Sequence, residues 1–257
     1  MITAIIPARG NSKGIPGKNL EYVGEKWLLE YTLDAAIESK LIDCVVLTTE
    51  DDAIMKVAYN IFHSQDKSFD VFKRPSELSQ DHVQVDEVAL FALRQIQLNW
   101  QSDLPDTIVI LQPTSPFRGA KHIDEAIEFY QLINDDRQAW EDKRIVFSVC
   151  EPGHTYQVVD GEKALSLDDP RFRLGRQQEH DVPYAVENGA IYVVDAKLFG
   201  RQRSFRSPVM HPYWMDKWES LEIDTPLDLY IANCLMGNVD DTTPLDLYIA
   251  TPLMGNT

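Results

Sequence analysis

Short apolar runs alternate along the chain with longer segments in which apolar residues recur at helical spacing. The runs predict buried strands at residues 2–6, 43–48, 70–73, 107–111, 144–150 and 190–194. The longer segments predict helices at residues 27–40, 51–62, 85–100, 123–133 and 226–235. Strands that alternate with helices are typical of an α/β fold with a mostly parallel sheet. Because the strands are continuously apolar, we expect helices on both faces of that sheet.

The alternation stops after Cys150. Residues from about 151 to 186 are mostly polar, contain the turn pairs Pro152-Gly153 and Asp160-Gly161, and allow a hairpin at residues 156–167. We therefore predict a small insertion that leaves the main sheet, within one domain that spans residues 1–238. Leu221 to Asp224 should then form an extended segment that leads into the last helix.

The end of the chain contains an internal repeat. Residues 225–238 and 243–256 are identical at twelve of fourteen positions, but the second copy lacks the lead-in Glu222-Ile223-Asp224. A solenoid needs about three or more stacked units, so a single duplication does not indicate one. We interpret residues 239–257 as a terminal duplication, or a cloning or assembly scar, without a function of its own.

Composition narrows the possible functions. The net charge of −17 argues against a nucleic-acid partner, which requires a basic surface. No apolar run approaches the roughly 18 residues of a membrane span, and the N-terminus does not resemble a signal peptide. Cys44, Cys150 and Cys234 are far apart and form no CxxC motif, so we expect buried thiols at the first two and a reducing, cytoplasmic location.

The loop after the first strand carries the clearest candidate chemistry. Residues 7–20 contain three glycines together with Arg9, Ser12, Lys13 and Lys18. Glycines allow backbone N–H groups to approach an anion, and ligands of α/β sheets bind beyond the carboxyl ends of the strands. The loop therefore predicts a polyphosphate site. It is not a Walker loop, because Asn19 follows Lys18 where Ser or Thr would hold magnesium.

Four segments in order resemble the CMP-sialate synthetase (acylneuraminate cytidylyltransferase) family: ARGNSKGIPGKN at residues 8–19, LQPTSPFR at 111–118, ENGAIY at 187–192 and LEIDTPLDL at 221–229. The resemblance implies a Rossmann-like three-layer nucleotidyltransferase fold with a small dimerisation insertion. It implies a homodimeric cytidylyltransferase that joins CTP to a nine-carbon sugar acid of the sialic-acid type, with Mg²⁺, and releases pyrophosphate.

The resemblance also implies roles for single residues. Arg9 and Lys13 would contact the triphosphate, Lys18 would lie near the α-phosphate, and Ser12 and Asn19 would add neutral donors. Arg74 would read the cytosine. The residues implied on the sugar side are Gln112, Arg176 and Asn188. Asp224 and Glu222 would bind the metal; the family usually has Asp at both positions, and we expect Asp224 to be the more important ligand.

Several alternatives stay open at this point. The same chemistry could act on legionaminic, pseudaminic or 3-deoxy-octulosonic acid, and the chain could instead be a nucleotide-binding regulatory module without turnover. The carboxylate pair favours the enzyme, although the spacing reveals no general base. The enzyme hypotheses require that Lys18 and Asp224 face each other across one crevice.

Overall fold

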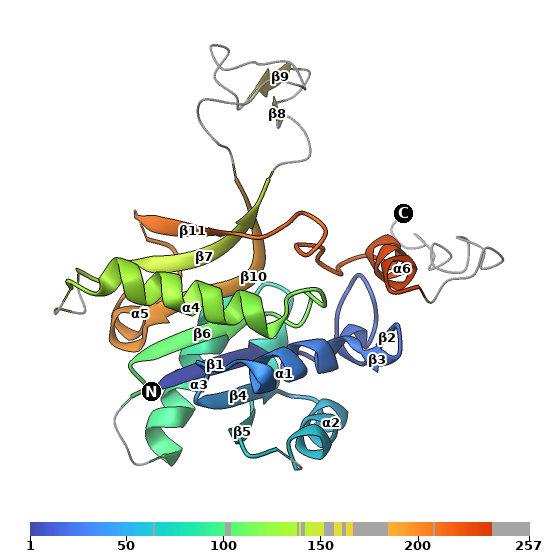
Figure 1. Cartoon of the computed structure of the whole chain (residues 1–257). Helices are drawn as coiled ribbons and strands as arrows, with labels where there is room; N and C mark the ends of the chain where they lie inside the picture. The colour runs from blue at the N-terminus through green and yellow to red at the C-terminus, as the bar shows by residue number, and fades with distance from the viewer. Residues whose placement is uncertain are drawn as a thin grey trace.

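The computed structural model describes residues 1–63, 65–100, 104–137, 139, 142–151, 157–160, 163–166, 185–207 and 209–237. A seven-stranded sheet with the order β11-β7-β10-β6-β1-β4-β5 forms its centre (Figure 1). Its strands are β1 (Ile2–Pro7), β4 (Cys44–Thr49), β5 (Ser68–Lys73), β6 (Thr107–Leu111), β7 (Ile145–Cys150), β10 (Val186–Asp195) and β11 (Met210–Trp214). Within this sheet β10 runs antiparallel to both neighbours, and the other pairings are parallel. The mostly parallel α/β fold is confirmed.

Helices cover both faces of the sheet, which gives three layers (Figure 1). They are α1 (Leu28–Glu38), α2 (Asp52–Phe62), α3 (Val85–Asn99), α4 (Ala120–Asn134), α5 (Ala196–Gln202) and α6 (Pro226–Leu235). Successive residues of a strand point to opposite faces. Ala4 and Ile6 accordingly join one core cluster with α1, α2 and α4, whereas Ile5 joins a second cluster with α3 and α5.

A third, smaller core cluster brings the two ends of the domain together. Ile15 of the N-terminal loop and Val23 of β2 (Tyr22–Val23) pack with Ile223 and with Leu229 of α6. Strand β2 pairs with β3 (Lys26–Trp27) in a short hairpin, and α6 lies beside it in Figure 1. This packing holds the glycine-rich loop against the segment that carries Glu222 and Asp224.

Three of the departures from the sequence predictions have a physical reason in the structure. The helix expected from residue 27 begins at Leu28 because Trp27 pairs with Tyr22 in the hairpin. The strand expected at 190–194 already begins at Val186, since it continues through an irregularity between Glu187 and Tyr192. Strand β11 is not predicted from the sequence because Pro212 interrupts its apolar pattern, and proline is tolerated there because β11 is an edge strand.

Part of the predicted insertion is described. Strands β8 (Gln157–Asp160) and β9 (Lys163–Ser166) pair antiparallel with each other, as the predicted hairpin requires, and join no strand of the main sheet. The remainder of that insertion and the duplicated tail at 239–257 lie outside the described residues. Cys44 and Cys150 are free and buried, as expected. None of the helices in the described ranges has the length and apolar character that a bilayer span needs.

Candidate active site

The loops beyond the carboxyl ends of β1, β5 and β6 line a cavity of about 230 Å³, together with the segment before α6. This is the edge where parallel sheets bind their ligands. Six of the residues predicted from the sequence line the cavity: Arg9, Lys18, Asn19, Arg74, Gln112 and Asp224. The structure therefore gathers positions that are more than two hundred residues apart along the chain.

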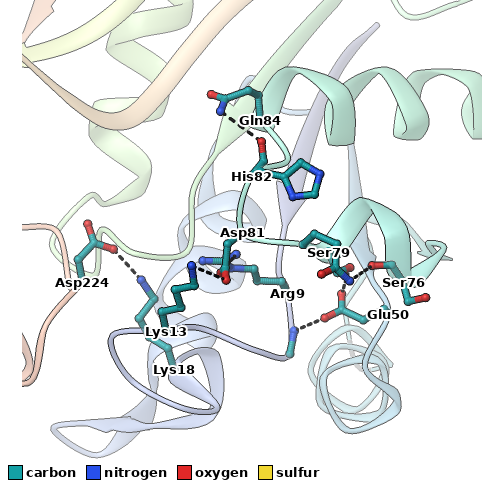
Figure 2. A network of polar contacts seen from close by, with 12 residues as sticks. Arg9, Lys13, Lys18, Glu50, Ser76, Ser79, Asp81, His82, Gln84 and Asp224 are labelled. Carbon is teal, nitrogen blue, oxygen red and sulfur yellow. Dashed lines mark hydrogen bonds and ion pairs between the residues drawn. The ribbon is translucent and has the colours of Figure 1, made fainter. Parts of the chain in front are cut away.

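Lys18 and Asp224 form a direct ion pair (Figure 2). The Lys18 Nζ atom lies 2.8 Å from Asp224 Oδ1 and donates a second hydrogen bond of 2.8 Å to the carbonyl oxygen of Ile223. The side chain of Lys18 is only 10% exposed, whereas that of Asp224 is 64% exposed. An ammonium group has three N–H donors, so the described partners leave one donor for an oxygen atom in the cavity.

Gly14 allows the loop to approach this carboxylate segment closely. A Cβ atom at Gly14 would lie 2.0 Å from the backbone oxygen of Asp224, which is far inside van der Waals contact. The loop is also tied to itself, because Asn19 Nδ2 donates a 2.7 Å hydrogen bond to the carbonyl oxygen of Arg9. These contacts fix the loop that carries Lys18, which lines the cavity.

The start of α6 orients Asp224. Thr225 is the N-cap residue, and its Oγ1 accepts a hydrogen bond from the backbone N–H of Asp228. Asp228 Oδ2 in turn accepts hydrogen bonds from the N–H of Thr225 (2.7 Å) and the N–H of Asp224 (3.2 Å). Asp228 is thus the acidic residue in the first turn of α6 and completes a capping box with Thr225. This capping box sets the backbone direction at Asp224.

Glu222 lies deeper than Asp224 and faces different partners. Thr114 Oγ1 donates a 3.4 Å hydrogen bond to Glu222 Oε1, and a Cβ at Gly189 would lie 2.7 Å from the same oxygen. Burial, followed by the negative charge of Asp224, raises the pKa of Glu222 to about 7. The two carboxylates therefore interact electrostatically, although Glu222 does not contact Lys18 directly.

Arg9 and Lys13 converge on Asp81, which the sequence did not single out (Figure 2). Arg9 Nη1 lies 2.9 Å from Asp81 Oδ1, and Lys13 Nζ lies 3.1 Å from Asp81 Oδ2. Lys13 is 80% exposed and Arg9 36% exposed. Ser12 is half-buried in the same loop and has no hydrogen bond to the described residues. The loop thus presents two cations that are held by one carboxylate.

Arg74 is buried in a polar network with Glu50 and Ser79. Its Nη2 lies 3.1 Å from Glu50 Oε2, and its Nε donates to Ser79 Oγ at 2.9 Å. Ser79 Oγ donates a 2.6 Å hydrogen bond to the same Glu50 oxygen, while Glu50 Oε1 accepts one of 2.7 Å from the N–H of Gly10. The side chain of Arg74 is 2% exposed. Glu50 therefore connects the glycine-rich loop at residues 7–20, where we predict a polyphosphate site, to Arg74, the residue predicted to read the cytosine.

The predicted sugar-side residues fall into different environments. Gln112 Nε2 donates a 2.9 Å hydrogen bond to the carbonyl oxygen of Gly189 and lines the cavity. Asn188 is 4% exposed; it accepts a 2.5 Å hydrogen bond from Ser148 and donates one of 2.7 Å to Ser220. Its side chain holds strand β10 in place within the fold. Arg176 lies outside the described residues.

The oxygen chemistry near Lys18 is compatible with a hard divalent cation. Glu222 and Asp224 offer only carboxylate oxygens, and the Asp224 side chain is well exposed. Within the described residues, no group of three or more His, Cys, Asp or Glu side chains forms a complete protein cage. A cation here would therefore have to take further ligands from a bound phosphate and from water, which is how Mg²⁺ commonly binds.

Comparison with known sequences decides the family. The family described as cytidylyltransferase matches residues 3–231, which is most of the chain. The chain belongs to the cytidylyltransferase family. It is 31% identical over 234 residues to an N-acylneuraminate cytidylyltransferase of Escherichia coli, with 90% of this chain and 51% of that protein covered. It is 29% identical to the CMP-N,N'-diacetyllegionaminic acid synthase of Legionella pneumophila, with 91% of this chain and 96% of that protein covered.

The chain spans about half the length of the curated N-acylneuraminate cytidylyltransferases that it matches. Solved structures agree on the fold. The structure of CMP:2-keto-3-deoxy-manno-octonic acid synthetase complexed with CTP has a TM-score of 0.60 at 17% identity, and covers 92% of this chain and 98% of its own. A 4-diphosphocytidyl-2C-methyl-D-erythritol synthase has a TM-score of 0.62 at 15% identity, with 91% and 97% covered.

In this member of the cytidylyltransferase family, the sequence predictions missed Glu50, Ser79 and Asp81. Glu50 directly follows the buried strand β4, so its position at a strand end was a usable signal. The same position also favours a helix cap, a role that Asp51 fills by accepting hydrogen bonds from the N–H groups of Ala53 and Ile54. Asp81 had no signal of its own, because its partners Arg9 and Lys13 are about seventy residues away.

Proposed function

We propose that the chain is a cytidylyltransferase that couples CTP to a nonulosonic acid of the sialic-acid type and releases pyrophosphate. The observation that carries this proposal is the Lys18–Asp224 pair at 2.8 Å in the cavity that Arg9 and Gln112 also line. Cations for a triphosphate and a carboxylate suited to a divalent metal meet at one place. The non-catalytic alternative is less favoured, because a binding module needs no such pairing.

In the proposed reaction a sugar hydroxyl oxygen attacks the α-phosphorus of CTP, and the bond to the pyrophosphate oxygen breaks. Arg9 and Lys13 bind the outer phosphates. Lys18, whose Nζ is buried and fixed by Ile223 and Asp224, stabilises the charge that develops on the α-phosphoryl oxygens. A preorganised cation is worth more there than in water. Ser12 and the N–H groups of the loop add neutral donors.

We assign the base end of the cavity to Arg74. Its Nε and Nη2 are engaged by Glu50 and Ser79, which fixes the guanidinium plane of a residue that lines the cavity. Cytosine offers O2 and N3 as acceptors. Asn19 acts mainly by fixing the loop, because its Nδ2 bonds Arg9 O while its Oδ1 is buried without a partner in the described structure.

We assign the sugar-acid end to Gln112, with Asn188 as a positioning residue. Gln112 lies next to Gly189 and Glu222, so a sugar hydroxyl near Gln112 would also be near the carboxylate segment. Asn188 orients the start of β10 through Ser148 and Ser220. Arg176 is proposed, from the sequence resemblance, to pair with the substrate carboxylate.

We propose Mg²⁺ as the cofactor, held by Asp224 and, directly or through water, by Glu222. When bound, the ion would neutralise phosphate charge and lower the pKa of the attacking hydroxyl. Asp224 has the exposed oxygens that this needs. A cytoplasmic homodimer is part of the same proposal. The β8–β9 pair, which is separate from the main sheet, supports the insertion as the dimerisation element.

Pyrophosphate release tests the function. The full chain is incubated with Mg²⁺, N-acetylneuraminic acid and each of CTP, ATP, GTP and UTP in turn. We expect release with CTP alone; equal use of all four nucleotides would reject the base assignment. Legionaminic, pseudaminic and 3-deoxy-octulosonic acids are then compared as acceptors with CTP fixed. CTP binding without any release would favour the regulatory module.

A further inference from the structure

Asp81 occupies a place that the proposed function reserves for phosphate. Its carboxylate presents Oδ1 to Arg9 at 2.9 Å and Oδ2 to Lys13 at 3.1 Å, so one anion bridges both cations (Figure 2). A phosphate group that contacted Arg9 and Lys13 together would lie at the same position. Two anions cannot share it, because like charges at contact distance repel strongly. Asp81 and the outer phosphates therefore exclude each other.

A phosphate group could readily replace Asp81 in its contacts with Arg9 and Lys13. Asp81 is exposed and lies in the turn between the 3-10 helix Ser76–Ser79 and α3. Hydrogen bonds from Lys13, together with the charges of Lys13 and Arg9, lower the pKa of Asp81, so it is ionised at neutral pH. Exposed ion pairs contribute little to stability. Displacement of the carboxylate therefore costs little, and the fold does not depend on it.

The flanks of this turn are anchored more firmly than Asp81 itself. On one side Ser79 bonds Glu50 and Arg74, and on the other side Glu87 accepts a hydrogen bond from the N–H of Gln84 at the start of α3. The backbone N–H of Val83 also donates to the carbonyl of Gln80. Asp81 can thus turn away from the cations while the walls of the cavity stay in place.

We propose that Asp81 is a specificity-determining residue that acts as an internal substitute for phosphate: it holds Arg9 and Lys13 together in the free protein and is displaced by the triphosphate. The inference rests on the proposed function for the identity of the nucleotide, but the anion exchange itself does not require turnover. Ligands with several linked phosphates can contact both cations and displace Asp81. A single phosphate can bridge the same two cations, but it carries less negative charge than a chain of linked phosphates and therefore competes less well with Asp81.

The test measures binding of tripolyphosphate, orthophosphate and cytidine to the full chain by calorimetry, without metal. Asp81→Asn removes the charge and keeps the size of the side chain. We expect it to bind tripolyphosphate about three- to tenfold more tightly, which is the factor that loss of two exposed ion pairs implies. Orthophosphate should gain less, and cytidine should be unchanged. Asp81→Glu keeps the charge and should stay near the wild type.

Glu77→Gln is the matched control. Glu77 lies in the same segment and is exposed, so its substitution changes the net charge equally without touching Arg9 or Lys13. We expect it to leave tripolyphosphate binding unchanged. Unchanged or weaker tripolyphosphate binding by Asp81→Asn, or an equal gain in Glu77→Gln, would overturn the proposal. Because the probe carries no base, failure of CTP turnover would reject the proposed function and leave this result standing.

Discussion

Lys18 Nζ and Asp224 Oδ1 are 2.8 Å apart although 206 positions separate the residues in the sequence. The pair joins a loop that follows the first strand to the segment that precedes the last helix. The lysine side chain of the pair is buried, and the aspartate side chain is exposed. Lys18 is consequently fixed by the protein, while Asp224 retains oxygens that can face a ligand.

Replacement of Lys18 by methionine tests its proposed position at the α-phosphate. We expect kcat to fall by about 100-fold or more, since loss of one preorganised donor in other enzymes has that effect, whereas the Kd for CTP should change little. Stopped-flow measurement of pyrophosphate release separates the two quantities. Lys26→Met is the control, because Lys26 pairs with Asp34 outside the cavity. A Lys18 variant with near wild-type kcat would refute the role.

Asp224 should contribute more than Glu222 to Mg²⁺ binding. Asp224→Asn should raise the Mg²⁺ concentration needed for half-maximal activity by about tenfold or more, since loss of outer-shell partners alone has such effects. Glu222→Gln should have the smaller effect, because Glu222 is more buried and has a raised pKa. Mg²⁺ titrations of both variants decide the order. A larger effect at Glu222 would reverse the assignment of the principal ligand.

Gly14→Ala should separate the loop from the carboxylate segment. The new Cβ would lie 2.0 Å from the backbone oxygen of Asp224, so the two stretches of backbone must move apart. Misplacement of a catalytic group by about 1 Å can cost about 100-fold in rate, and we expect kcat/KM to fall to that extent. Gly119→Ala is the matched control, because a Cβ atom at Gly119 would meet no atom within 4 Å. Equal activity of the two variants would contradict the close approach.

Glu50→Gln should destabilise the protein. It leaves Arg74 buried, with a side chain 2% exposed, beside a neutral partner, and breaking a buried ion pair costs about 3 kcal/mol. Chemical denaturation at pH 7 measures the loss. Glu128→Gln, at an exposed site on α4, should stay within about 0.5 kcal/mol of the wild type. A similarly small change in Glu50→Gln would show that the network contributes little.

The stabilising effect of Glu50 should depend on pH in one direction. Burial by itself raises the pKa of Glu50, but hydrogen bonds from Ser79 and the N–H of Gly10, with the charge of Arg74, lower it below the ordinary value of 4.5. The folded state therefore favours the ionised form. The stabilisation is complete above pH 4.5 and disappears as the pH falls through the lower, folded-state pKa. Over that acid range the stabilities of the wild type and Glu50→Gln should converge.

Removal of residues 240–257 should leave turnover unchanged. The family match ends at residue 231, and the capping box that orients Asp224 is formed by Thr225 and Asp228 in the first copy of the repeat. Steady-state kinetics of the shortened and full chains give the comparison. A shortened chain that folds, as judged by its circular dichroism and melting temperature, but loses activity would assign a function to the duplicated tail.

Local patterns were sufficient to predict the α/β architecture and most of the helices and strands. The strand Cys44–Thr49 begins with four consecutive apolar residues because both of its faces are buried, and that pattern is visible in the sequence. Motif resemblance likewise indicated Arg9, Lys18, Gln112 and Asp224, which the structure brings to one cavity. It could not reveal that Asn188 is enclosed by Ser148 and Ser220.

The sequence by itself determined which segments form strands and helices and which side chains carry charge near the ends of those strands. The motif resemblance led us to expect Lys18 opposite Asp224, as the structure has it. Only the tertiary structure decided the other pairings: Asp81 with Arg9 and Lys13, and Glu50 with Arg74 and Gly10. Secondary structure follows from the periodicity of neighbouring residues, whereas an ion pair requires two distant residues within about 4 Å. That distance is set by how the sheet and its helices pack, and no local pattern encodes it.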